Sequence, residues 1–191
     1  MKGAITPHTE ALLTLLDRAL KDEESEVLSN AAFAIGILIE YSEANLAAHL
    51  GHILQALHPL FVVALNAPAP RLNAKDNAAG AVARIIIRYP NAIPLDQVLP
   101  VFLSALPLKN DHLENRPVFR AIFNLFTTNG ALLYGFLDQL LPVFAYVLEP
   151  SGKDHIGDEI RAELIRYIAL INQEASDKVH AAGLGAFLPG A

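Results

Sequence analysis

The sequence contains no cysteine and no tryptophan, and its single methionine is the first residue. Without thiols, the chain can form no disulfide framework, no thiolate nucleophile and no cysteine-based zinc site. This composition fits a reducing compartment. No apolar run reaches the length of a membrane span, because charged residues, histidine or proline interrupt each candidate run. The first ten residues also lack the apolar segment of a secretory signal peptide. We therefore expect no membrane partner.

Basic charge is scarce as well. The chain has 20 acidic residues against 14 lysines and arginines, a formal net charge of −6. The excess is even, with ten acids to seven bases in residues 1–100 and again in 101–191. A nucleic-acid-binding protein normally carries a basic stripe, so we expect no nucleic-acid partner. On charge alone, a basic protein is the better candidate.

Catalytic and cofactor motifs are also missing. The sequence has no nucleophile elbow, no glycine-rich phosphate loop and no paired-carboxylate motif, so we expect neither an enzyme nor a cofactor. His49 and His52 would share one helix face, with His58 nearby, which could suggest a metal site. No acid or further histidine at ligand spacing completes it. We expect an exposed helix edge there and no metal.

What the sequence does contain is a repeat. The segment 95–106, LDQVLPVFLSAL, returns 42 residues later as LDQLLPVFAYVL at 137–148, and a weaker copy lies at 54–65. The register is kept by three prolines and by the phenylalanines two positions after them: Pro59, Pro100, Pro142, Phe61, Phe102 and Phe144. Self-similarity at a fixed period near 42 residues is typical of stacked-repeat proteins.

Between the copies, apolar residues recur at helical spacing. The pattern predicts helices over 9–20, 27–41, 46–65, 71–88, 95–106, 115–127, 133–148 and 156–171, and a short last segment over 176–187. Thr6 or Thr9 could cap the first helix, and Ser25 the second. Residues 150–154 read as a turn. Sustained alternation typical of strands is missing.

These elements predict an all-α fold, an α-solenoid of about four HEAT repeats plus a C-terminal helix. We expect one array over 1–191, with repeats near 7–41, 46–88, 94–127 and 133–172 and a terminal helix over 174–187. A single helical pair cannot bury its apolar face, so neighbours stack. The prolines cost least in a first turn, or where a kink bends the helix. Since the Leu12, Leu16 and Leu20 side has no polar cover, we expect the chain to be the C-terminal fragment of a longer solenoid.

Three stretches carry a resemblance. Residues 29–38, SNAAFAIGIL, residues 76–84, DNAAGAVAR, and residues 94–115, PLDQVLP through ALPLKNDHLEN, resemble the C-terminal HEAT repeats of importin-beta family nuclear transport receptors, in the importin-4 branch. The first two stretches are general HEAT signals, whereas the run from Leu-Pro-Leu-Lys into Glu-Asn is more specific. The resemblance covers about residues 9 to 185.

The resemblance implies a carrier that shuttles between cytoplasm and nucleus. Such receptors bind basic cargo, pass the nuclear pore and release the cargo to Ran-GTP. In this branch the implied cargo includes core histones and ribosomal proteins, and nucleoporins are further candidate partners. Ran-GTP is held mainly by N-terminal repeats of the family, which this sequence lacks. We therefore expect Ran-GTP to bind only through those missing repeats.

The resemblance also implies cargo-binding residues. Matched position by position, it indicates Asn77, Glu114 and Asn115 as side chains that hold cargo lysines. Leu113 stands where the family pattern has a second acid, which lowers the negative charge of the pocket.

The chemistry of lysine recognition leads to a similar set. Lysine offers three donors and a point charge, so an asparagine carbonyl beside carboxylates suits it. Asn30 and Asn77 stand at equivalent places in two helices; in the third helix the register allows either Asn115 or Val118. In the fourth helix the candidates are Glu159 or Glu163, and Asp158, Glu159 and Glu163 lie within about one turn of each other. The hypothesis is a ladder of asparagine and acid across the concave face.

A structural interpretation stands beside each candidate. The asparagines could join neighbouring repeats, and the acids could lie on a solvated face. Exposed ion pairs contribute about 0.2–1 kcal/mol each, while micromolar binding needs about 8 kcal/mol. A long basic segment must therefore also lay its aliphatic stems along the groove. The alternative function is a HEAT scaffold or regulatory subunit outside transport that docks another folded protein.

Overall fold

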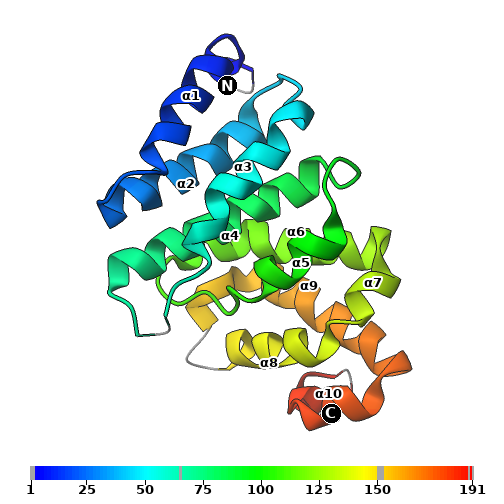
Figure 1. Ribbon diagram of the computed structural model, residues 1–191. Coiled ribbons are helices and arrows are strands. Elements are labelled where there is room, and N and C mark those ends of the chain that lie inside the picture. Colours follow the sequence, from blue (N-terminus) through cyan, green and yellow to red (C-terminus); the bar gives the residue numbers. More distant parts are fainter. Residues whose placement is uncertain (1–2, 65, 150–152, 189, 191) are drawn as a thin grey trace. The chain divides into compact units, whose positions relative to one another are not determined.

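The computed structural model describes residues 3–64, 66–149, 153–188 and 190. The chain is 77% helical, and the described residues form no strand. The predicted fold class, an all-α HEAT-repeat solenoid, is confirmed. The chain forms two compact units, Met1–Val118 and Phe119–Ala191. Figure 1 labels the helices that make them up. The predicted repeat boundaries stay a prediction.

The first unit is a series of helical pairs joined by short turns. Its elements are η1 (Thr6–His8), α1 (Thr9–Ala19), α2 (Ser25–Tyr41), η2 (Ala47–His49), α3 (Leu50–Leu57), η3 (His58–Leu60), α4 (Ala69–Arg88), α5 (Leu95–Leu103) and η4 (His112–Glu114). Helix α6 (Asn115–Thr128) begins in this unit and continues into the second.

The second unit contains the rest of α6 and the helices that follow it. These are α7 (Gly130–Tyr134), α8 (Leu137–Leu148), α9 (Lys153–Glu174), α10 (Ser176–Ala181) and η6 (Leu184–Phe187).

The core of the first unit includes an extensive contact between α2 and α4. Small side chains allow it, because Ala32, Ala78 and Ala81 are fully buried. A Cβ atom placed on Gly36 would lie 3.2 Å from the Ala81 Cα atom, so the two backbones are in close approach there. The alanine-rich second helices therefore pack backbone against backbone.

The core of the second unit is aromatic. The Phe119 and Phe144 rings lie 6.2 Å apart between centroids and join α6 to α8. Phe119 and Phe123 are 1% and 4% exposed, so both are core residues of this unit. Phe123 also stacks on Tyr167 of α9, with ring centroids 4.8 Å apart.

The repeated prolines do not lie in a first turn. Pro100 and Pro142 occupy the sixth position of α5 and α8, and both are exposed. Helix α3 ends at Leu57, and Pro59 lies in the 3-10 turn η3 instead of inside a helix that runs to residue 65. Proline has no N–H for a helical bond, so α5 and α8 each lack one bond on a side that water reaches.

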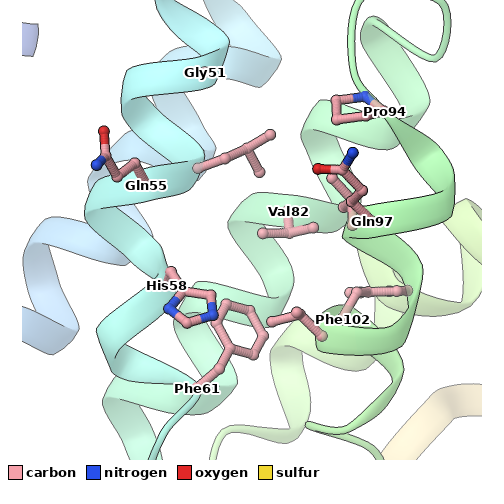
Figure 2. Close-up of a pocket in the computed structure, with 11 residues that line it drawn as sticks. Gly51, Gln55, His58, Phe61, Val82, Pro94, Gln97 and Phe102 are labelled. Carbon is pink, nitrogen blue, oxygen red and sulfur yellow. The ribbon is translucent and has the colours of Figure 1, made fainter.

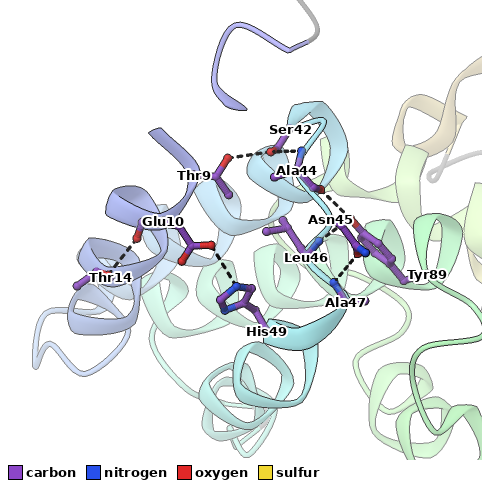
Figure 3. Close-up of polar contacts among 10 residues, drawn as sticks. All are labelled: Thr9, Glu10, Thr14, Ser42, Ala44, Asn45, Leu46, Ala47, His49 and Tyr89. Carbon is purple, nitrogen blue, oxygen red and sulfur yellow. Dashed lines mark hydrogen bonds and ion pairs between the residues drawn. The ribbon is translucent and has the colours of Figure 1, made fainter. Parts of the chain in front are cut away.

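The predicted caps are wrong, because the threonines are used elsewhere. Thr9 Oγ1 lies 2.8 Å from Ser42 Oγ (Figure 3), and Thr6 Oγ1 accepts from the Glu43 N–H at 2.9 Å. Both contacts tie the start of the chain to the end of α2. Ser25 is the first residue of α2 and makes no capping bond.

Two predicted helices are divided differently in the structure. The helix expected over 133–148 is split into α7 and α8. Helix α9 begins at Lys153, before the expected Ile156, and Gly157 breaks it with φ +69°, a value that favours glycine. Leu65 and residues 150–152 of the predicted turn lie outside the described residues.

Candidate functional site

The seven predicted cargo-binding residues differ in exposure. Asn30, Asp158 and Glu159 are exposed, and Glu163 is half-buried. The other three are buried, with exposed fractions of 6% for Asn77 and 2% for both Glu114 and Asn115. Asn30, Asn77, Glu114 and Asn115 belong to the first unit; Asp158, Glu159 and Glu163 belong to α9 in the second.

Asn77 joins α4 to α2. Its Nδ2 donates to Ser29 Oγ at 2.9 Å. Its Oδ1 is buried and has no hydrogen-bond partner among the described residues. The Asn77 amide thus makes a structural contact through its nitrogen and has an unused acceptor in its oxygen. A buried acceptor without a hydrogen-bond partner lowers the stability of the fold.

Glu114 is held by an arginine of the same chain. Arg84 Nη2 donates to Glu114 Oε1 at 3.2 Å, Nη1 donates to Oε2, and Arg84 Nε donates to Glu40 Oε2 at 2.9 Å. Burial raises the pKa of the Glu114 carboxyl, and the Arg84 guanidinium opposes that rise. A cargo lysine would therefore have to displace Arg84 to reach Glu114, whereas Glu40 keeps 42% of its side chain exposed.

Asp76, which sequence reasoning missed, fixes the loop before Glu114. Its Oδ2 accepts three backbone N–H groups, from Lys109 at 3.1 Å, Asn110 at 2.7 Å and Asp111 at 2.9 Å. Burial raises the pKa of Asp76, and these backbone hydrogen bonds oppose the rise. The position of Asp76 next to Asn77 was the only sequence feature that pointed to it. Its hydrogen-bond partners lie more than 30 residues away along the chain.

In the second unit, two of the predicted acids of α9, Glu159 and Glu163, face α6. Glu159 Oε1 lies 3.6 Å from Arg120 Nη2. One turn later, Glu163 lines a pocket of about 290 Å³ between the two helices. Asp158 is exposed beside them. The other residues that line the pocket, none predicted, are Arg120, Phe123, Asn124, Thr127 and Tyr167.

The first unit also holds an apolar groove of about 460 Å³ between α3 and α5 (Figure 2). Phe61, Phe102 and Val82 form part of its wall, while Gln55, Gln97 and His58 supply polar groups. The repeated phenylalanines Phe61 and Phe102 thus face a space shared by two successive proline-bearing segments.

One histidine of the 3-10 helix η2 and one of α3 contact acids of α1. His49 Nε2 lies 3.2 Å from Glu10 Oε1 (Figure 3), and His52 Nε2 lies 2.7 Å from Asp17 Oδ1. Within the described residues, no group of three or more histidine, aspartate and glutamate side chains could hold a metal ion. The helices described there are also too short or too polar to cross a membrane.

Comparison with known proteins gives the relationship. No family model matches the chain. The probable importin subunit beta-4 of Schizosaccharomyces pombe is 41% identical over 168 residues, which cover 88% of this chain and 15% of that protein. Human importin-4 is 28% identical over 171 residues, covering 90% of this chain, and mouse importin-4 is 29% identical over 168 residues, covering 88%.

The chain thus spans about 15% of the length of these relatives. The predicted resemblance is confirmed. In sequence, over about nine-tenths of its length, the chain is related to the importin-4 branch of the importin-beta (karyopherin-beta) receptors.

Proposed function

We propose that this chain is the cargo-binding part of a nuclear import receptor that works in the cytoplasm and the nucleus. It acts as a carrier and not as an enzyme. Its cargo is a lysine-rich segment of a basic protein, with core histones and ribosomal proteins as the first candidates. The observation that carries this proposal is the similarity to importin-4 proteins over about nine-tenths of the chain.

The geometry supports a lysine-reading role in two ways. The Oδ1 atom of Asn77 is a buried acceptor without a partner among the described residues, and a lysine ammonium group would supply the missing donor. Acidic side chains also outnumber basic ones in each half of the chain, which favours a basic partner.

The accessible members of the predicted set carry the initial contact. Asn30, Asp158, Glu159 and Glu163 are open to water in whole or in part. Glu114 is already neutralised by Arg84, so it contributes to binding only if the guanidinium moves toward Glu40. Ran-GTP and nucleoporins are partners of the longer receptor in this proposal.

The direct test is the binding of a labelled histone amino-terminal tail peptide at low and at physiological salt. The native peptide should bind with micromolar affinity, and lysine acetylation should abolish binding. Asn77→Ala should weaken binding, while Glu149→Gln, a charge removal at an exposed position after α8, should not. No binding at low salt would contradict the proposal for this chain.

The groove between α3 and α5 favours a second candidate, a HEAT scaffold that docks another folded protein. Its wall is mainly apolar (Figure 2), and an apolar contact depends little on salt, whereas an ionic one weakens as salt rises. Binding to a partner that persists unchanged at high salt, and that is lost in Val98→Asp, would favour the scaffold.

A further inference from the structure

The pocket between α6 and α9 has two chemically different walls. Phe123 and Tyr167 stack with an interplanar angle of 6°, and Phe126 stacks on Tyr167 with ring centroids 5.3 Å apart. The Tyr167 hydroxyl donates to the Phe123 carbonyl oxygen at 3.1 Å and lies 3.1 Å from Thr127 Oγ1. This aromatic wall is therefore fixed, and its hydroxyl is already bonded.

The other wall presents acceptors. Asn124 lines the pocket, and its Oδ1 is buried with no hydrogen-bond partner among the described residues. A buried acceptor is unfavourable while it stays unpaired. Glu163 faces the same space from α9 and forms no ion pair with any residue that the structure describes. The two acceptors differ in kind, one a neutral carbonyl oxygen and the other a carboxylate.

Two acids and one base stand around the pocket when Glu159 at its rim is counted with Arg120 and Glu163 of its lining. Arg120 also lines it, but its guanidinium lies 3.6 Å from Glu159, so one acid balances one base at the rim. Glu163 is left as the uncompensated charge. A cation is the ligand that satisfies the carboxylate and also supplies a donor to Asn124.

We propose that this pocket binds the ammonium group of one lysine side chain, which bonds Asn124 Oδ1 and Glu163 while its aliphatic stem packs along Phe123 and Tyr167. A volume of about 290 Å³ accommodates a single such side chain. Two acceptors and water match the three donors of lysine, whereas the five donors of arginine would remain partly unpaired. That the lysine belongs to imported cargo rests on the proposed function; the pocket itself does not.

The pocket is tested with a single amino acid, Nα-acetyl-lysine methylamide, titrated into the isotopically labelled chain and followed by NMR. Signals of Asn124, Glu163 and Tyr167 should shift together and saturate. The Nε-acetylated form should cause no shift, and the arginine analogue should bind more weakly. An absence of shifts at these residues, or equal binding of arginine, would overturn the assignment.

Two variants separate binding from folding. Glu163→Gln and Asn124→Leu should each weaken binding of the lysine analogue about tenfold or more, the effect of losing one hydrogen bond to a charged group. Glu149→Gln removes the same kind of charge away from the pocket and should leave binding unchanged. Thermal unfolding of each variant shows that the fold is retained.

The histone-tail peptide then distinguishes this inference from the proposed function. If the peptide binds but Glu163→Gln and Asn124→Leu leave its affinity unchanged, the pocket is overturned and the proposed function stands. If the analogue occupies the pocket but no basic peptide binds, the pocket stands and the proposed function fails.

Discussion

Gly80 has no side chain, and the Glu114 carboxylate occupies the space that one would need. A methyl group at this position would overlap Glu114 Oε2 and lie 3.0 Å from Arg84 Nη1. Since both groups are buried and paired with each other, neither can move aside freely. Gly80→Ala should lower the free energy of unfolding by about 1–3 kcal/mol, although alanine favours helices by about 1 kcal/mol. Urea unfolding measures the change.

Gly51 supplies the matched control. It also lies inside a helix, but no heavy atom lies within 4 Å of a Cβ built there. Gly51→Ala should therefore raise the free energy of unfolding by about 0.5–1 kcal/mol. If both variants were stabilised, the Arg84–Glu114 pair would be more mobile than its burial indicates.

At the residue scale, sequence reasoning identified Asn77 and Glu114 but not what holds them. Asn77 bonds a serine 48 positions away, and Glu114 pairs with an arginine 30 positions away. Local spacing contains no information about such partners, because they meet only when α2, α4 and η4 pack. For this reason the sequence did not predict that Arg84 pairs with Glu114, nor the roles of Asp76 and Asn124.

Among the helices, α5 and α8 each keep an exposed proline at the sixth position. Pro100→Ala would add a backbone N–H that can donate to the Asp96 carbonyl oxygen and would remove the clash of the ring. We expect the free energy of unfolding to rise by about 1–3 kcal/mol, less the entropy that alanine restores to the unfolded chain. A fall in the midpoint of thermal unfolding would instead mean that the first unit needs the proline-bearing shape of α5.

The stability of the first unit should depend on pH through Asp17 of α1. The hydrogen bonds from Lys21 and His52 lower the pKa of Asp17 below its usual value of 3.8. A lowered pKa stabilises the fold above the unfolded value, and this contribution is lost as pH falls through the folded value. Asp17→Asn should therefore be less stable than the natural chain at pH 6.

The difference between the two proteins should vanish as pH falls below 3.8 and through the lowered pKa of Asp17. Thermal unfolding midpoints measured across this range check the sign. A difference that stays constant with pH would assign the effect of the substitution to lost packing and not to charge.

The existence of most helices could be predicted, because apolar spacing is local and strong. Helix α4 ends at Arg88 as expected and begins at Ala69, two residues earlier than predicted. The predictions failed where the chain changes direction, at Pro59, between α7 and α8, and at Gly157. At these places the end of a helix depends on tertiary packing and on backbone geometry, which the spacing of apolar residues does not reveal.

For the molecule as a whole, net charge influences the rate at which a charged partner associates. The net charge of −6 is shared by both halves of the sequence. The association rate of a lysine-rich peptide should therefore fall as salt rises, since screening shortens the attraction. Stopped-flow fluorescence at several salt concentrations measures this dependence. An unchanged association rate would indicate that the acids do not steer the encounter.

The fold class was predictable because a 42-residue period repeats along the chain, whereas the candidate site was not fully predictable. Which acids face solvent depends on how each helix rotates against its neighbour. Glu163 meets the Asn124 pocket, while Glu114 turns inward to Arg84. The two residues are of the same type, and their different surroundings result from how their helices pack.

The three amides held by Asp76 have a consequence for how the loop opens. Lys109, Asn110 and Asp111 belong to a connection between helices, where backbone N–H groups usually exchange with solvent deuterium within seconds. A single buried carboxylate of α4 accepts all three hydrogen bonds. The three amides can therefore exchange only when their hydrogen bonds to that carboxylate break. The hydrogen-exchange protection factors of these three amides should therefore be equal to one another and similar to those of amides in α4. Exchange at this exposed loop would then measure the local stability of the buried helix.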